Sequence, residues 1–93
     1  MSFPDHLTPR RHPDTAFRVF EGEAVLISPT QNMVRLLNVT GSRIWELLDG
    51  EHSIADIAAI LSQEFEVSPA HALSSVRAFV QTLAERQLIL LEP

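Results

Sequence analysis

Residues 33–50 read Met33-Val34-Arg35-Leu36-Leu37-Asn38-Val39-Thr40-Gly41-Ser42-Arg43-Ile44-Trp45-Glu46-Leu47-Leu48-Asp49-Gly50, and the spacing of their apolar side chains changes midway. Up to Leu37 the run is short and apolar, with one charged residue, which is typical of a β-strand. From Asn38 onward the apolar positions repeat with helical spacing, and the pair Thr40-Gly41 is a helix start signal. Gly50 is a natural left-handed cap that ends this helix. The stretch predicts a strand that leads directly into a helix.

Two further apolar runs precede this strand, at residues 16–20 and 23–28. Gly22 lies between them and supplies the positive φ that a tight hairpin requires. Residues 29–32 have the composition of a turn. The three runs therefore predict a three-stranded antiparallel meander in which 33–37 is the third strand.

Helical patterns also fill the second half of the chain. Ser53 with Asp56 resembles a capping box, and Ser68-Pro69 combines an N-cap with proline at the first helical position. Apolar stripes follow both signals: Ile54, Ile57, Ala58, Leu61 and Phe65, then Leu73, Val76, Phe79, Val80 and Leu83. The run 88–91 predicts a terminal strand or tail. The fold class is α+β, a three-stranded antiparallel sheet followed by three helices, with a winged-helix-like arrangement.

A chain of 93 residues is long enough for one core. Residues 1–14 carry three of the six prolines, which remove backbone donors and favour extended conformations. We expect 1–14 to be an N-terminal arm that is flexible, or docked on or exchanged with a neighbouring molecule. Residues 15–93 are then the folded domain.

Composition limits the possible functions. The formal net charge is −5, which disfavours binding to phosphate backbones, and there is no apolar run long enough to span a membrane. The chain has no cysteine, and its N-terminus lacks the pattern of a secretion signal, so we expect a cytoplasmic protein.

No pattern of catalytic residues is present. The four histidines lack metal-ligand spacing, no serine lies in a nucleophile elbow, and the three glycines cannot form a phosphate-binding loop. We therefore expect no metal, no cofactor and no enzymatic activity.

In the third strand, Met33, Arg35 and Leu37 are expected to face one way and Val34 and Leu36 the other. The strand is unusual because both faces are largely apolar and it carries neither proline nor lysine. If it lies at a sheet edge, its unpaired backbone groups would accept a partner peptide. Alternatively, residues 88–91 or the arm cover it. Trp45 has two interpretations as well: a core residue of the first helix, or the floor of a binding groove.

These residues resemble the PqqD family. The resemblance lies in the string 37–50 (L-N-x-T-G-x-x-I-W-x-L-L-D-G) and in Ser53–Leu61, with supporting likeness at 25–29, 76–83 and 87–89. It spans roughly residues 16–90 of the chain.

The resemblance implies a winged-helix-like, non-catalytic peptide chaperone, also called a RiPP recognition element. Such domains bind the leader of a ribosomally made precursor peptide and present it to a modifying enzyme, often a radical S-adenosylmethionine (SAM) protein. The leader adds a strand beside the third strand, in a cleft walled by the third helix. By position, the resemblance assigns peptide binding to Met33, Val34, Arg35, Leu36 and Leu37 on the strand, and to Leu73, Val76, Arg77 and Val80 on the helix.

Two other functions remain open at this stage. A winged-helix DNA-binding regulator would place basic residues on its recognition helix, but the second helix has none and the last has only Arg77 and Arg86. A dimerisation module would exchange the proline-rich arm between two copies, and a homodimer of this kind is compatible with peptide binding.

Overall fold

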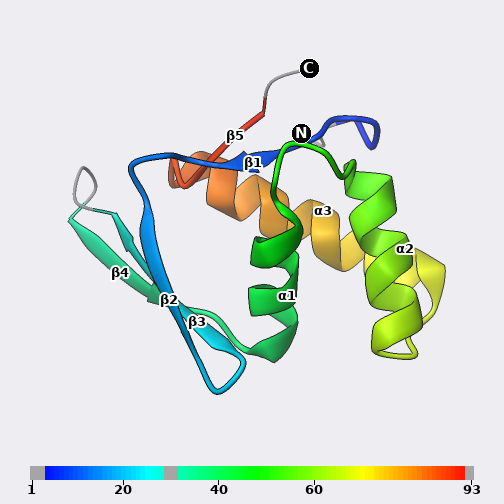
Figure 1. Ribbon diagram of the computed structural model, residues 1–93. Coiled ribbons are helices and arrows are strands. Elements are labelled where there is room, and N and C mark those ends of the chain that lie inside the picture. The colour runs from blue at the N-terminus through cyan, green and yellow to red at the C-terminus, as the bar shows by residue number, and fades with distance from the viewer. Residues whose placement is uncertain (1–3, 29–31, 92–93) are drawn as a thin grey trace.

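The computed structural model describes residues 4–28 and 32–91. In it a sheet lies to one side of helix α1, and α2 lies on the opposite side (Figure 1). The sheet contains β2 (Ala16–Phe20), β3 (Glu23–Ser28) and β4 (Met33–Leu36), paired antiparallel in the order β2-β3-β4. The three predicted strands and their meander are confirmed.

The turn between β2 and β3 also follows the sequence. Glu21 and Gly22 both have positive φ, 52° and 80°, as in the two-residue turns that match the twist of a hairpin. Of the predicted second turn, only Asn32 falls within the described residues; positions 29–31 lie outside them.

The three predicted helices are α1 (Val39–Leu47), α2 (Ile54–Glu64) and α3 (Pro69–Glu85). Ser53 and Asp56 form the capping box of α2, and Ser68 caps α3 through a 3.2 Å bond from the His71 amide. The N-cap of α1 is Asn38, whose Oδ1 accepts the Gly41 amide at 2.8 Å. The helix therefore begins earlier than the Thr40-Gly41 signal indicated.

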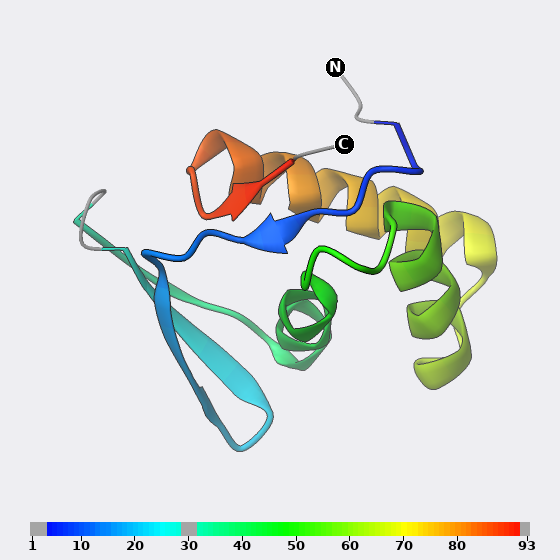
Figure 2. The ribbon, with the colours of Figure 1, turned by 45° about the horizontal axis from the view of Figure 1, so that its top comes forward.

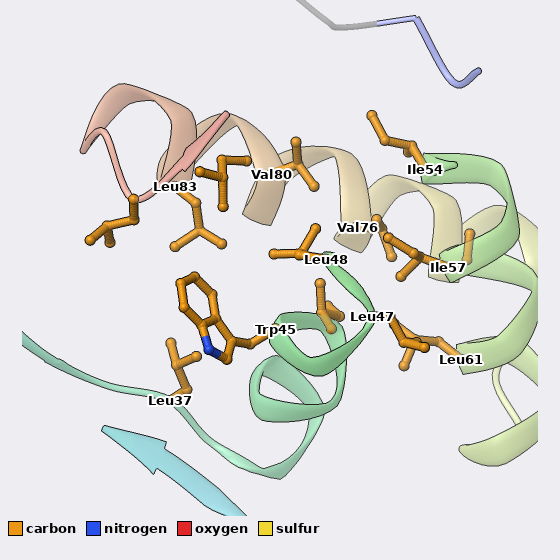
Figure 3. Packing of buried hydrophobic residues seen from close by; sticks show 14 of the residues in the cluster. Leu37, Trp45, Leu47, Leu48, Ile54, Ile57, Leu61, Val76, Val80 and Leu83 are labelled. Carbon is orange, nitrogen blue, oxygen red and sulfur yellow. The ribbon is translucent and has the colours of Figure 1, made fainter. Parts of the chain in front are cut away.

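The core lies between the helices and the inner face of the sheet. Trp45 is fully buried, and its ring meets that of Phe17 edge to face with centroids 5.7 Å apart. The same core contains apolar side chains from all three helices and from Leu48, just after α1 (Figure 3); among the helical ones are Leu47, Ile54, Ile57, Leu61, Val76, Val80 and Leu83. Trp45 is thus a core residue, and the alternative that it floors a groove is wrong.

The arm is docked on its own domain over the residues that are described. β1 (Arg10–Arg11) pairs antiparallel with β5 (Ile89–Leu90) to form a second, two-stranded sheet. The arm, drawn in blue, passes beside β5 and over the end of α1 (Figure 2). The sequence predicted a terminal strand or tail at 88–91 but not its pairing with β1. The two segments lie at opposite ends of the chain, and neither contains a local pattern that identifies the other as its partner.

Hydrogen bonds join the arm to helix ends. The carbonyls of Leu7 and Asp5 accept the amides of Ile54 and Ala55 at 3.0 and 3.1 Å, in the first turn of α2. The Arg11 guanidinium donates to the Trp45 carbonyl at 2.9 Å, at the end of α1. Both ends of a helix leave backbone groups without intrahelical partners, and the arm supplies some of these partners. These contacts join residues 5–11 to the helices, and the division of the chain into an arm at 1–14 and a domain at 15–93 stays a prediction.

Across the described residues, no helix has both the length and the apolar character to cross a membrane.

Candidate peptide-binding groove

β4 is an edge strand. It pairs with β3 on one side only, whereas β1 and β5 pair with each other in the separate sheet. Among the described residues, neither terminal segment adds to β4, so the alternative in which the arm or residues 88–91 cover it is wrong. A strand edge of this kind exposes a row of backbone donors and acceptors.

The register shows which backbone groups face outward. Leu37 donates its amide to the Ala24 carbonyl at 2.8 Å, which makes Ala24 and Leu37 a hydrogen-bonded pair of the antiparallel ladder. Such pairs alternate with pairs that do not exchange bonds. Arg35, opposite Leu26, therefore turns its main-chain groups toward β3, while Val34 and Leu36 turn theirs to the open edge.

Side chains of β4 alternate between the two faces of the sheet. Met33 and Arg35 are half-buried on the inner side, and Leu37, just after the strand, is buried. On the outer side Val34 is 69% exposed and Leu36 77% exposed. The alternation predicted from the sequence is confirmed, and the large apolar side chains at the edge remain accessible.

A groove of about 300 Å³ lies between the end of β4 and α3. Arg35, Leu36 and Leu37 line it from the strand, and Phe79 closes it from the third helix. The rest of its lining comes from the start of α1, namely Asn38, Thr40, Gly41 and Ile44. The groove thus combines a strand edge with apolar walls.

Three hydrogen bonds fix the start of α1, and one of them joins it to β3. Besides the Asn38 cap, the buried Ser42 hydroxyl accepts the Ala24 amide at 2.6 Å and donates to the Leu37 carbonyl at 3.4 Å. Gly41 fits closely at this point, because a Cβ there would lie 3.1 Å from Asn38 Oδ1 and 3.5 Å from Phe79 Cζ. A larger residue at 41 would fill the floor of the groove.

The helix-side residues assigned from the resemblance do not line this groove. Val76 and Val80 are fully buried in the core (Figure 3), and Leu73 packs partly buried against it. Arg77 turns to the arm, where its Nε donates to Asp5 Oδ1 at 2.8 Å. This hydrogen bond and the charge of Arg77 hold the pKa of the Asp5 carboxyl below its ordinary value.

The residue that faces the groove from α3 is Phe79, which belonged to the predicted apolar stripe but was not assigned to the site. Successive helical residues are rotated by about 100°, so neighbours in sequence occupy different faces. Val80 faces the core, and Phe79, one position earlier, faces β4. The sequence did contain a signal for this assignment. Phe79 and Val80 are adjacent apolar residues of one helix, so they cannot both face the core, and one of them had to face another surface.

The described residues contain no group of three histidine, aspartate or glutamate side chains placed to hold a metal ion. The arrangement offers main-chain hydrogen bonds, apolar walls and one guanidinium, which are the means of binding an extended peptide.

Fold and site define a small α+β domain with an uncovered strand edge beside a helix. The family model described as Coenzyme PQQ synthesis protein D (PqqD) matches residues 23–89. The match includes most of the chain, so the chain belongs to the PqqD family, which confirms the resemblance seen in residues 37–61. No curated protein matches the chain at a significant level.

Similar solved structures share the fold over most of the chain. TbiB1 in complex with the TbiA(beta) leader peptide is 24% identical, with 86% of this chain and 93% of that chain covered and a TM-score of 0.80. Lasso peptide synthetase B1 complexed with the leader peptide is 29% identical, with 89% of this chain and 98% of that chain covered and a TM-score of 0.79.

A third structure is the solution NMR structure of the PqqD truncation of Methylobacterium extorquens PqqCD, which represents a functional, stand-alone RiPP recognition element. It is 24% identical, covers 88% of this chain and 87% of its own, and has a TM-score of 0.72. The predicted α+β class is confirmed.

Proposed function

We propose that this chain binds the leader of a ribosomally made precursor peptide and presents the peptide to a separate modifying enzyme. The observation that carries the proposal is the open edge of β4 beside the groove that Phe79 closes, in a member of the PqqD family. Two of the similar structures are complexes with leader peptides, which supports this assignment.

The peptide adds a strand to β4. Its main chain bonds the outward amides and carbonyls of Val34 and Leu36, and every second side chain enters the groove. Leu36, Leu37 and Phe79 supply apolar contact there, and Arg35 favours a carboxylate on the peptide. Met33 is the first residue of the strand that pairs with the peptide. On the helix side, the apolar contact assigned to Val76 and Val80 comes from Phe79.

The chain itself performs no chemical step in this proposal. Catalysis belongs to the partner, for which we propose a radical SAM protein or another peptide-modifying enzyme, and a newly made precursor places the complex in the cytoplasm. Exchange of the arm between two copies would form the same β1–β5 contacts across a dimer. We propose that the arm stays on its own domain, where its carbonyls accept backbone amides at the start of α2.

A DNA-binding role receives no support from the described residues. Arg77, one of the two arginines of the last helical segment, is paired with Asp5, and the net charge of −5 opposes approach to phosphates. This leaves peptide binding as the function that the geometry favours.

A selection experiment tests the proposal without knowledge of the natural precursor. The purified chain is used to select from a random-peptide display library, and the enriched peptides are titrated by fluorescence anisotropy against wild type and Val34→Pro. Proline at 34 removes an outward donor, so we expect peptide affinity to fall about tenfold. Absence of any enriched peptide, or binding to duplex DNA at sub-micromolar protein, would overturn the proposal.

A further inference from the structure

A second hollow lies at the opposite end of the α3 face that carries Phe79. Its volume is about 160 Å³. It is lined by Leu61 and Phe65 at the end of α2, Val67 of the connection, His71, Ala72 and Ser75 of α3, and Thr40 of α1. Of these residues, Thr40 also lines the groove beside β4.

Local hydrogen bonds hold the walls of this hollow in place. The Ser62 hydroxyl donates to the Val67 carbonyl at 2.6 Å, and the Phe65 amide donates to the Leu61 carbonyl at 2.9 Å. Ser68 caps α3 immediately beyond, by accepting the amide of His71. The connection between α2 and α3 is therefore fixed by its own side chains, so the hollow is already formed in the free protein.

The hollow continues the groove beside β4. Thr40 lines both. On α3 the residues His71, Ser75 and Phe79 follow at intervals of four, so they lie in one row along the helix. Thr40 thus lies between the groove and the hollow, which together form one continuous surface that begins at the end of β4.

The size and lining of the hollow suit one apolar side chain. An apolar protein cavity of roughly 150 Å³ is large enough to hold benzene. The lining is mostly aliphatic or aromatic, from Leu61, Phe65, Val67 and Ala72, and it includes neither a carboxylate nor a guanidinium. A leucine or phenylalanine side chain would fit the hollow and be removed from water there. A charged side chain would find no oppositely charged group in the lining.

We propose that the hollow at Phe65, Val67 and Ser75 binds a second apolar side chain of the same peptide, beyond the segment paired with β4. This inference rests on the proposed function. The seven steps along the helix from Ala72 to Phe79 span roughly 10 Å, the length of about three extended peptide residues. The peptide therefore carries two apolar anchors about three residues apart, and the second one adds selectivity that strand addition by itself does not supply.

Blocking the hollow tests the proposal. Ser75→Phe places a ring at its mouth from an exposed position, and Ser74→Phe makes the same change at a neighbouring exposed residue that lines neither depression. The probes are the peptides enriched by wild type from the random library, each made also with its second apolar anchor replaced by alanine. Anisotropy gives the dissociation constants, and thermal melts check folding.

We expect Ser75→Phe to weaken the parent peptides about ten- to hundredfold, the effect of losing one buried apolar side chain. Ser74→Phe stays within about twofold of wild type, as surface substitutions do. The alanine-substituted peptides bind wild type and Ser75→Phe equally, because the contact is already absent. If the parent peptides bind Ser75→Phe as tightly as wild type, the second anchor is wrong. Strand addition at β4 is unaffected by that result.

A measurement on the unaltered protein covers the case in which Ser75→Phe fails to fold. A photoreactive leucine at the second anchor of an enriched peptide crosslinks on irradiation to whatever surrounds it, and mass spectrometry locates the site. We expect crosslinks at residues 65–75. Crosslinks confined to β4 overturn the inference, whereas failure of wild type to enrich any peptide tests only the proposed function.

Discussion

The three helices and the three-stranded sheet use apolar residues in opposite ways. In the helices many large apolar side chains are buried completely, as at Ile57, Val76 and Leu83. In the sheet every residue of β2 is exposed, and Phe20, Val34 and Leu36 have exposed fractions of 73%, 69% and 77%. Apolar surface that folding leaves in water on one element marks a contact with another molecule. The comparison separates a part that folds the chain from a part that binds.

The largest expected effect comes from the same substitution made in each region. Leu83→Ala, in α3, empties a fully buried site and should lower the free energy of unfolding by about 2–5 kcal/mol. Leu36→Ala removes an exposed side chain, so its effect on the same free energy should stay within about 0.5 kcal/mol. Denaturant unfolding followed by circular dichroism measures both. Comparable destabilisation by the two variants would contradict the division between helices and sheet.

Proline at two adjacent positions of β4 distinguishes its two edges. Arg35→Pro removes a donor directed at β3, and the unpaired Leu26 carbonyl should cost about 1–3 kcal/mol of stability. Val34→Pro removes a donor on the open side, where proline is accommodated in edge strands. Its thermal melt should resemble that of wild type, although its peptide affinity falls. A melt in which Val34→Pro is the less stable variant would mean that the strand is paired on the other side.

The smallest effect concerns an ion pair that joins two helices. Arg43 of α1 binds Glu64 of α2 through two bonds, of 2.8 and 2.9 Å, and this hydrogen bonding lowers the pKa of the Glu64 carboxyl. A group with a lowered folded-state pKa stabilises the protein above its unfolded pKa, and the contribution is lost as the pH falls through the folded pKa.

Glu64→Gln should therefore lower the melting temperature slightly at neutral pH and not at all in acid below the folded pKa of the carboxyl. Thermal melts across the acidic range measure this difference. Glu85→Gln is the control, since Glu85 is an exposed carboxylate of α3 for which the structure shows no ion pair among the described residues. A Glu64→Gln difference that persists unchanged in acid would exclude the ion pair as its cause.

Local signals in the sequence were sufficient for the elements of both regions. The capping residues Ser53 and Ser68 start α2 and α3 as predicted, and Gly22 occupies the hairpin turn with positive φ. The alternation within residues 33–37 correctly separated Met33 and Arg35 from Val34 and Leu36, and the structure shows that the first pair is half-buried and the second exposed. Each of these features depends on residues only a few positions apart, whose interactions are set by backbone geometry.

Contacts between distant residues were not predictable in the same way. The sequence alone determined the strands, the helices, the charge and the family-like string at 37–50. The tertiary structure decided that Arg10 pairs with Leu90, that no other described segment covers β4, and that Phe79 rather than Val80 faces the groove. The physical reason is that periodicity shows how wide the apolar stripe of a helix is. Which part of that stripe meets the core and which meets a groove depends on how the other elements pack around it.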